Sequence, residues 1–298
     1  MGSISGMKPE VTVILGPTAA GKTDYAIKLA KQRDGMIISA DSRQVYAGMN
    51  IGTAKPSKAW AETPHDVLTP DSVQGVDHFL FNIQTPDHPV TLADWQTAAR
   101  QVIDHILSQH KHPILVGGTM LYIDSIVYNY SLPRVAPNTE LRAKLEQEEA
   151  GQLYQQLLAQ DPEASSYIEP SNKRRIIRAL EVMQATETSF SSLRQQQPSP
   201  YQFSLIGLFP GWEILTQRIQ QRQKTMFTEG LLTETQKLLD AYGISLPLLQ
   251  TINYTQAVKV LNEEYTFEEA LQESLRVNLR YARRQMSWWR RHNTIHWI

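Results

Sequence analysis

Cysteine is absent from this chain of 298 residues, and so is any apolar run long enough to span a membrane. The first absence excludes disulfides and zinc sites with thiolate ligands, and it is compatible with a reducing compartment. The second gives no transmembrane helix, and the first seven residues lack the apolar core of a signal peptide. We therefore expect a cytoplasmic protein without a membrane partner.

Charge of one sign is not in excess either. The chain has 29 Lys and Arg residues against 30 Asp and Glu residues, which gives a formal net charge of −1. No global basic field attracts such a protein to nucleic acid, so any nucleic-acid site must be local. There is no internal repeat or low-complexity tract, and 41% hydrophobic residues are enough for one large core and a smaller appendage.

The clearest positive signal is a phosphate-binding loop, GPTAAGKT, between an apolar run at 11–15 and a helical pattern at 22–33. Its backbone N–H groups and the positive end of the helix are expected to point at phosphate oxygens, with added charge from Lys22. Thr23 supplies a hydroxyl suited to Mg²⁺. A ligand-free turn rarely matches this pattern in this context, so we predict a phosphorylated ligand. The loop consists of Gly16, Pro17, Thr18, Ala19, Ala20, Gly21, Lys22 and Thr23.

Two further buried strands, predicted at 36–40 and 113–116, each lead to a polar loop at the carboxyl end, where doubly wound sheets bind ligands. Asp41 follows the first strand and has several interpretations: a helix cap, a contact to the water shell of magnesium, or a general base. Thr119 follows the second, as a helix N-cap or as a ligand contact. The first loop continues with Ser42, Arg43 and Gln44.

The order of these segments predicts an α/β fold, a P-loop protein with a doubly wound, mainly parallel sheet. A strand at 203–209 is expected to rejoin that sheet. Residues 57–89 are rich in Pro, Asp and His and predict a loop with short elements, whose histidines lack any metal-ligand spacing. Residues 138–199 are helical and polar between prolines, which predicts a small all-helical insertion in a core of 8–137 and 200–298.

Three helices carry local positive charge. Arg218 and Arg222 lie at i, i+4 on a helix from about Glu213, and this face can reach an anion. Basic residues at 173–178 open a helix, against its macrodipole, which weakly favours a binding role. The last helix runs from a capping box at 266–269 to about Arg291, with six arginines among aromatics. The helix dipole favours acidic residues at the start and basic residues at the end, which accounts for about half of this pattern. Six arginines among aromatics exceed that preference, and this combination suits a nucleic-acid backbone with unstacked bases.

Together these segments resemble the isopentenyl-tRNA transferase family, the tRNA dimethylallyltransferases. The element DSRQVY with GTAKP behind it is far more specific than the phosphate loop. The chain departs from the family pattern at 253–256, where NYTQ replaces the usual G-Y-R-Q, and at Asp77-His78, which replaces paired histidines. The matches are GPTAAGKT at 16–23, SADSRQVY at 39–46, GMNIGTAKP at 48–56, VGGTMLY at 116–122, DPEA at 161–164, RIIRALEV at 175–182 and YARRQMSW at 281–288.

The resemblance implies transfer of a dimethylallyl group from dimethylallyl diphosphate to N6 of the adenosine immediately 3′ of the anticodon in tRNA. It implies catalytic roles for Asp41 as base, for Thr119 and for Arg222 on the leaving diphosphate, with Mg²⁺ on Thr23. A bacterial-type monomer without a zinc-finger extension is expected. The residues expected to hold the tRNA anticodon stem-loop are Asp41, Ser42, Arg43, Gln44, Thr119, Arg142, Arg174, Arg175, Arg178, Arg280, Arg283 and Arg284.

Two other classes of function remain open from the sequence. The first is a P-loop kinase of a nucleoside or small metabolite, with the helical insertion as a lid whose arginines close over ATP. Such a kinase consumes ATP when it is offered an acceptor. The second is a non-catalytic RNA-binding NTPase switch, which needs a base-specificity motif such as N-K-x-D, and the sequence has no such run.

Overall fold

The computed structural model describes residues 8–56, 59–133, 135–192 and 197–298. They divide into two compact units, one formed by the chain up to Ile123 together with Pro200–Ile298, and the other by Asp124–Ser199. The prediction for residues 1–7 lies outside the described residues, as do residues 193–196 of the predicted insertion. No helix in the described ranges combines the length and the apolar character that crossing a membrane requires.

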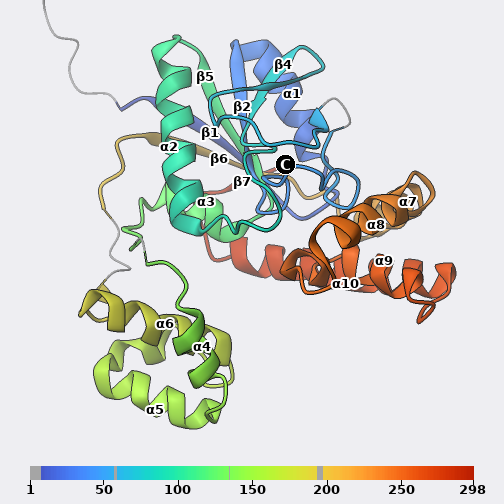
Figure 1. Cartoon of the computed structure of the whole chain (residues 1–298). Helices are drawn as coiled ribbons and strands as arrows, with labels where there is room; N and C mark the ends of the chain where they lie inside the picture. The colour runs from blue at the N-terminus through green and yellow to red at the C-terminus, as the bar shows by residue number, and fades with distance from the viewer. Residues whose placement is uncertain (1–7, 57–58, 134, 193–196) are drawn as a thin grey trace, which may run out of the picture. The chain divides into compact units, whose positions relative to one another are not determined.

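A seven-stranded sheet forms the centre of the first unit (Figure 1), with the order β3-β4-β2-β5-β1-β6-β7. All neighbours are parallel except the β3–β4 pair. This confirms the predicted doubly wound, mainly parallel sheet, and it places the phosphate loop after a central strand. The four longest strands are β1 (Glu10–Leu15), β2 (Gly35–Ala40), β5 (His112–Gly117) and β6 (Gln202–Gly207).

Helices cover both faces of this sheet, so its central strands are buried on both sides and read as continuous apolar runs. Ile14, Ile37 and Ile114 pack in one core cluster with residues of α1, α7 and α10. On the opposite face, Trp95 of α2 stacks on Tyr122 of α3. The helices that include residues of this unit are α1 (Lys22–Arg33), α2 (Leu92–Ser108), α3 (Met120–Val127), α7 (Trp212–Thr228), α8 (Leu231–Tyr242), η4 (Pro247–Gln250), α9 (Tyr254–Leu261) and α10 (Phe267–Trp289).

The prediction of a loop with short elements over 57–89 is confirmed for the described residues, where the short elements form a β-hairpin. Strands β3 (Asp71–Val73) and β4 (Val76–Phe79) are joined by Gln74 and Gly75, which both have positive φ, at 54° and 77°. Such a turn follows the right-handed twist of the strands. β4 pairs with β2, and a strand that was not predicted, β7 (His296–Trp297), pairs with β6. β4 and β7 are too short to show the alternation of apolar and polar residues by which a strand is recognised in a sequence. Residues 57 and 58 are not described.

The second unit is helical, and no strand occurs among its described residues, as predicted. Its core includes Leu153, Leu157 and Ile176, which are all fully buried. Asn172 caps the basic helix by accepting the Arg175 backbone N–H. The elements of the insertion are α4 (Thr139–Leu145), α5 (Ala150–Gln160), η2 (Pro162–Ser166) and α6 (Lys173–Thr186).

The second unit begins at Asp124 rather than at residue 138, where we expected its edge. The side-chain amide of Asn129 donates to the Pro198 carbonyl at 3.0 Å, and the Gln197 N–H donates to the Asn129 carbonyl. These bonds hold the stretch before residue 138 to the end of the insertion. The proline that we took as the edge of the insertion, Pro133, therefore lies within it.

Candidate active site

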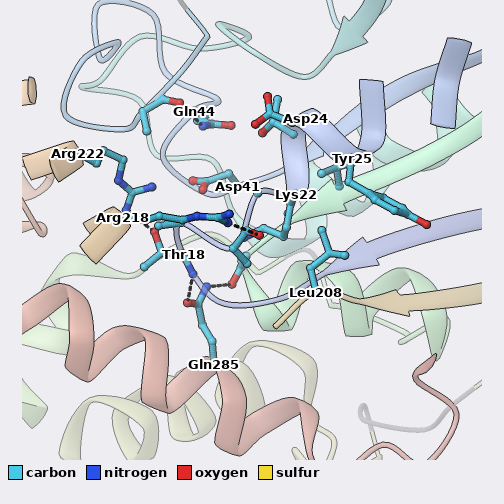
Figure 2. A pocket seen from close by; sticks show the side chains of 18 of the residues that line it. Thr18, Lys22, Asp24, Tyr25, Asp41, Gln44, Leu208, Arg218, Arg222 and Gln285 are labelled. Carbon is cyan, nitrogen blue, oxygen red and sulfur yellow. Dashed lines mark hydrogen bonds between the residues drawn. The ribbon is translucent and has the colours of Figure 1, made fainter. Parts of the chain in front are cut away.

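A cavity of about 750 Å³ lies at the carboxyl ends of β1, β2 and β5 in the first unit (Figure 2). This is the edge of a parallel sheet at which ligands bind. The cavity thus brings together the phosphate loop and the two strand-end loops that the sequence predicted. Its polar lining includes Thr18, Lys22, Thr23, Asp24, Lys28, Asp41, Gln44, Thr53, Arg218, Arg222, Tyr281 and Gln285.

The phosphate loop leaves β1 in close contact with the end of β6. Gly16 has φ of 146°, and a Cβ there would lie 2.4 Å from the Leu208 carbonyl oxygen, so only glycine fits. The Leu208 N–H in turn donates to the Leu15 carbonyl at 2.9 Å. Lys22 bends back across the loop, and its Nζ donates to the Pro17 carbonyl at 2.8 Å.

Three cations converge on this loop. Arg222 donates from Nη2 to the Thr18 hydroxyl, and Arg218 donates from Nη1 to the Ala20 carbonyl at 3.3 Å. Burial, and after it the nearby charge of Arg222, lower the pKa of Lys22 to about 7 against the opposing attraction of Asp41. Burial also lowers the pKa of Arg222 to about 10. Among the described residues, Arg222 Nε is buried without a hydrogen-bond partner. Positive charge held in this way favours an anionic ligand.

The loop after β2 is held by the loop after β5. The Thr119 hydroxyl accepts the Ser42 N–H at 3.0 Å, while the Thr119 carbonyl accepts N–H groups from Tyr122 and Ile123. Thr119 therefore begins helix α3 through its backbone and bonds the neighbouring loop through its side chain. Asp41 lies in the cavity lining, and its Oδ1 accepts the Arg43 N–H at 2.8 Å. No helix follows Asp41 in this described stretch, so the helix-cap interpretation is wrong.

Glu234 is a buried carboxylate that the sequence did not single out. It accepts backbone N–H groups from Asn50, Ile51 and Gly52 at 2.7 to 3.0 Å, and the Tyr254 hydroxyl at 2.6 Å. These bonds fix the GMNIGTAKP segment. Its carbonyl at Thr53 accepts the Gln44 amide at 3.1 Å, which places Gln44 at the cavity.

Helix α10 has two different faces. Its buried face contacts the cavity through Gln285 and Tyr281, and the Tyr281 hydroxyl donates to the Gly118 carbonyl at 3.3 Å. Its other face exposes the predicted cations Arg280, Arg283 and Arg284. Trp289 is fully buried, so the hypothesis that the aromatics of this helix meet unstacked bases is wrong for that residue. The guanidinium of Arg283 instead lies 5.9 Å from the ring centre of Trp212.

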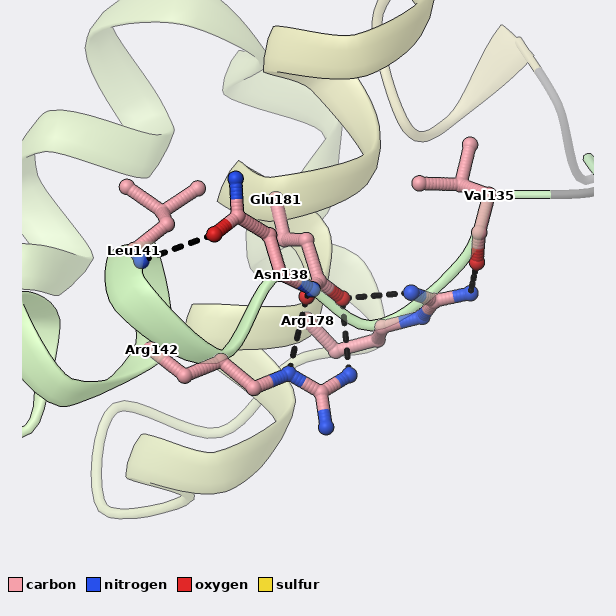
Figure 3. A network of polar contacts seen from close by, with 6 residues as sticks. All are labelled: Val135, Asn138, Leu141, Arg142, Arg178 and Glu181. Carbon is pink, nitrogen blue, oxygen red and sulfur yellow. Dashed lines mark hydrogen bonds and ion pairs between the residues drawn. The ribbon is translucent and has the colours of Figure 1, made fainter. Parts of the chain in front are cut away.

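The other predicted cations belong to the second unit, where a buried carboxylate holds two of them (Figure 3). Glu181 accepts hydrogen bonds from Arg142, from Arg178 and from the Asn138 backbone N–H. Burial alone would raise the pKa of Glu181, but these donors lower it to about 2. The side chains of Arg142 and Arg178 remain 39% and 33% exposed, so a single carboxylate holds both of them at the surface. Arg174 and Arg175 are exposed on α6.

The lowered pKa of Lys22 predicts a pH-dependent affinity for inorganic diphosphate. A bound anion favours charged Lys22 and raises its pKa, so binding above pH 7 requires uptake of a proton. Affinity should fall by up to about tenfold per pH unit between pH 7 and 9, and Lys22 should add no pH dependence below pH 6. Calorimetric titration of wild type and Lys22→Arg measures this, because arginine stays charged while the ligand titrates equally in both proteins. Parallel pH profiles would contradict the assignment.

Comparison with known proteins shows a match along most of the chain. The family model described as IPP transferase matches residues 44–292, and the one described as isopentenyl transferase matches residues 9–66. These ranges contain the cavity, the strand-end loops, the helical insertion and helix α10.

Individual proteins are similar over nearly their full lengths. The chain is 40% identical to a protein named tRNA dimethylallyltransferase from Acaryochloris marina over 98% of this chain and 93% of that one. It is 41% identical to a protein of the same name from Gloeothece citriformis, over 98% and 92%. The crystal structure of the full-length tRNA isopentenylpyrophosphate transferase from Bacillus halodurans is 35% identical, with a TM-score of 0.69 over 98% of this chain and 90% of that one.

Proposed function

The chain belongs to the IPP transferase family, and on this premise we propose that it transfers a dimethylallyl group from dimethylallyl diphosphate to tRNA. One observation carries the proposal: a single cavity joins the phosphate loop after β1 and three cations to the Asp41 carboxylate at the end of β2. A carboxylate that can take up a proton lies beside a site that can hold a leaving diphosphate. This arrangement suits alkyl transfer from an allylic diphosphate.

At the donor end, the C1–O bond breaks and the electron pair leaves with the diphosphate. Negative charge then grows on the leaving group while positive charge grows on the allylic carbon. Donors aimed at that developing negative charge stabilise the transition state, because they are ordered before the reaction begins. We assign this role to the loop amides, Lys22 and Arg222, whose buried Nε has no protein partner among the described residues.

At the acceptor end, the exocyclic amine N6 of adenosine forms the new bond to C1. The lone pair of this amine is delocalised into the ring, so the amine is a poor nucleophile until a base takes its proton. We assign the proton transfer to the Asp41 carboxylate, which lines the cavity. The adenine has to leave its stack in the RNA to reach this position.

The residues present fit a magnesium ion that is held mainly by the substrate. Thr23 offers an exposed hydroxyl at the start of α1, and within the described ranges no cluster of three or more His, Cys, Asp or Glu forms a protein cage. Mg²⁺ typically uses one or two protein oxygens together with phosphate oxygens and water. When bound, Mg²⁺ would neutralise charge on the leaving diphosphate.

The finer features of the substrate are also part of this proposal. We propose that the acceptor is the adenosine immediately 3′ of the anticodon, that the anticodon stem-loop is bound by the predicted arginines, and that the protein acts as a cytoplasmic monomer. Support for the RNA contact comes from the exposed cations of α10 and from the Arg142 and Arg178 pair of the insertion.

Labelled dimethylallyl diphosphate tests the proposal directly. Incubation with the protein, Mg²⁺ and unmodified tRNA should move the label into RNA and release diphosphate in equal amount, without consumption of ATP. A P-loop kinase would instead turn over ATP with a nucleoside acceptor and leave the RNA unlabelled. That second outcome would overturn the proposal.

The exposed cations of α10 lead to a prediction about RNA affinity. The double variant Arg283→Glu, Arg284→Glu should weaken tRNA binding at least tenfold at low salt, and the loss should shrink as salt rises. The variant Lys224→Glu, Lys237→Glu is a matched control, because it makes the same charge change at exposed positions of α7 and α8. Filter binding over a salt series distinguishes them, and equal affinities in both variants would make the α10 cations merely structural.

A further inference from the structure

Gln285 lies on α10 beneath the phosphate loop and is 1% exposed. Its side-chain oxygen accepts the backbone N–H of Thr18 at 2.8 Å, and its side-chain nitrogen donates to the carbonyl of Gly118 at 2.8 Å. Figure 2 shows this side chain reaching up to Thr18 from the helix. One amide group therefore joins the loop after β1 to the loop after β5.

The two loops joined by Gln285 belong to opposite ends of the proposed reaction. Thr18 carries the hydroxyl that Arg222 contacts, at the diphosphate end. Gly118 precedes Thr119, whose hydroxyl holds the Ser42 N–H next to the proposed base. Hydrogen bonds, linked through the backbone of Thr18 and of Gly118-Thr119, thus connect Arg222 to the loop that carries Asp41.

We propose that Gln285 is a positioning residue that fixes the spacing between the donor diphosphate and the attacking amine. The inference rests on the proposed function. The Gln285 amide bonds one backbone group of each loop and leaves Lys22, Arg222 and the Asp41 carboxylate to contact the ligands, so we expect it to matter for the distance between the ligands rather than for binding either one. Transfer between two bound reactants is steeply sensitive to that distance, and a misplacement of 1 Å costs about 10²-fold in rate.

The surroundings of Gln285 leave little freedom for another arrangement. A Cβ at Gly118 would lie 2.6 Å from the Gln285 side-chain nitrogen, so glycine at this position makes room for the amide. Glutamate at 285 would lack the donor for the Gly118 carbonyl. Asparagine is one methylene shorter. The amide of glutamine supplies one donor and one acceptor at the required reach.

The test compares Gln285→Ala with Gln223→Ala in the full-length protein. Gln223 is also 1% exposed, but neither of its side-chain polar atoms has a hydrogen-bond partner among the described residues. Both variants delete the same atoms from a buried site, and only the first breaks the tie between the loops. We expect kcat for prenyl transfer to fall about 10- to 100-fold in Gln285→Ala, with KM for the donor and Kd for inorganic diphosphate within about threefold. Gln223→Ala should keep kcat.

A second variant perturbs the same contact from its other side. Gly118→Ala pushes the Gln285 amide away and should lower kcat on its own. In the Gln285→Ala background the added methyl group meets no amide, so the double variant should be no slower than Gln285→Ala alone. This non-additivity is the signature of a shared contact.

The possible outcomes separate the inference from the proposed function. Absence of RNA labelling by the wild type overturns the proposed function. With an active wild type, unchanged kcat in Gln285→Ala overturns the positioning role. Parallel loss of kcat, of diphosphate affinity and of thermal stability in Gln285→Ala also overturns it, since the residue would then be only structural. A fall in kcat alone, with non-additivity at Gly118, supports it.

Discussion

Replacing Asp41 with asparagine is expected to lower kcat for prenyl transfer by about 10²- to 10⁴-fold, the range for loss of a general base. The substitution keeps the shape of the side chain and the acceptor for the Arg43 N–H, which now bonds Oδ1 at 2.8 Å. Only the proton-accepting carboxylate is lost. Single-turnover transfer with both substrates bound isolates this step, while tRNA and diphosphate affinities are measured separately and should change by less than about fivefold.

The control for this prediction is Asp41→Ala, which also removes the acceptor that orders the loop. If proton transfer is the role of Asp41, the two variants should lose activity to a similar extent. If the carboxylate only shapes the loop, the asparagine variant should be close to wild type in kcat. That outcome would contradict the assignment of the base.

Replacing Arg222 with methionine should have two opposite effects. Transfer should slow by about 10²- to 10³-fold, because a preorganised donor to the leaving group is removed. The ligand-free protein should become more heat-resistant, because the variant removes a buried donor without a partner and relieves repulsion with Lys22. Single-turnover kinetics and thermal unfolding without ligand measure both effects.

Arg222→Lys is the matched comparison. It keeps the positive charge but not the planar guanidinium that reaches Thr18. We expect its activity between those of wild type and Arg222→Met. A methionine variant that keeps wild-type transfer, or that loses activity only because it unfolds, would contradict a role for Arg222 in stabilising the leaving group.

Local patterns in the sequence predicted the parts of the fold that depend on local chemistry. Helix α1 was predicted to its end residues, because the phosphate loop marks its start and Asp34-Gly35 its end. The capping box of α10 was also confirmed, with Thr266 and Glu269 bonded reciprocally. Convergence of Asp41, at the end of β2, and the phosphate loop, at the end of β1, on one cavity followed from a single rule, that the carboxyl ends of parallel strands meet at one edge.

Contacts between distant parts of the chain were not accessible in this way. Glu234 meets the 50–52 amides across more than 180 residues, and Gln285 meets Thr18 across 267. Neither residue belongs to a pattern whose spacing reveals its partner. The burial of Trp289 was likewise not predictable, because the sequence pattern of an aromatic residue among arginines is the same whether that residue faces the core or the solvent.

One departure from the family pattern has a structural setting. Asn253 stands where the family usually has glycine, and it has a φ of 75° and a ψ of −49°, a conformation that glycine adopts most readily. Its side chain is fixed there, donating to the Gly52 carbonyl at 2.8 Å and accepting from Asn278 at 3.0 Å. Thr255 stands where the family usually has arginine, and its hydroxyl donates to the Thr251 carbonyl at 3.0 Å.

The central claim is that this cavity transfers a dimethylallyl group to an adenosine of tRNA. Mass analysis of nucleosides from tRNA incubated with the protein, Mg²⁺ and dimethylallyl diphosphate tests it most directly. We predict one new nucleoside with the mass of dimethylallyladenosine, which disappears when the adenosine 3′ of the anticodon is replaced by guanosine. The claim would be contradicted if the wild-type protein left all nucleosides of the tRNA unmodified. It would also be contradicted if the protein transferred phosphate from ATP to a nucleoside.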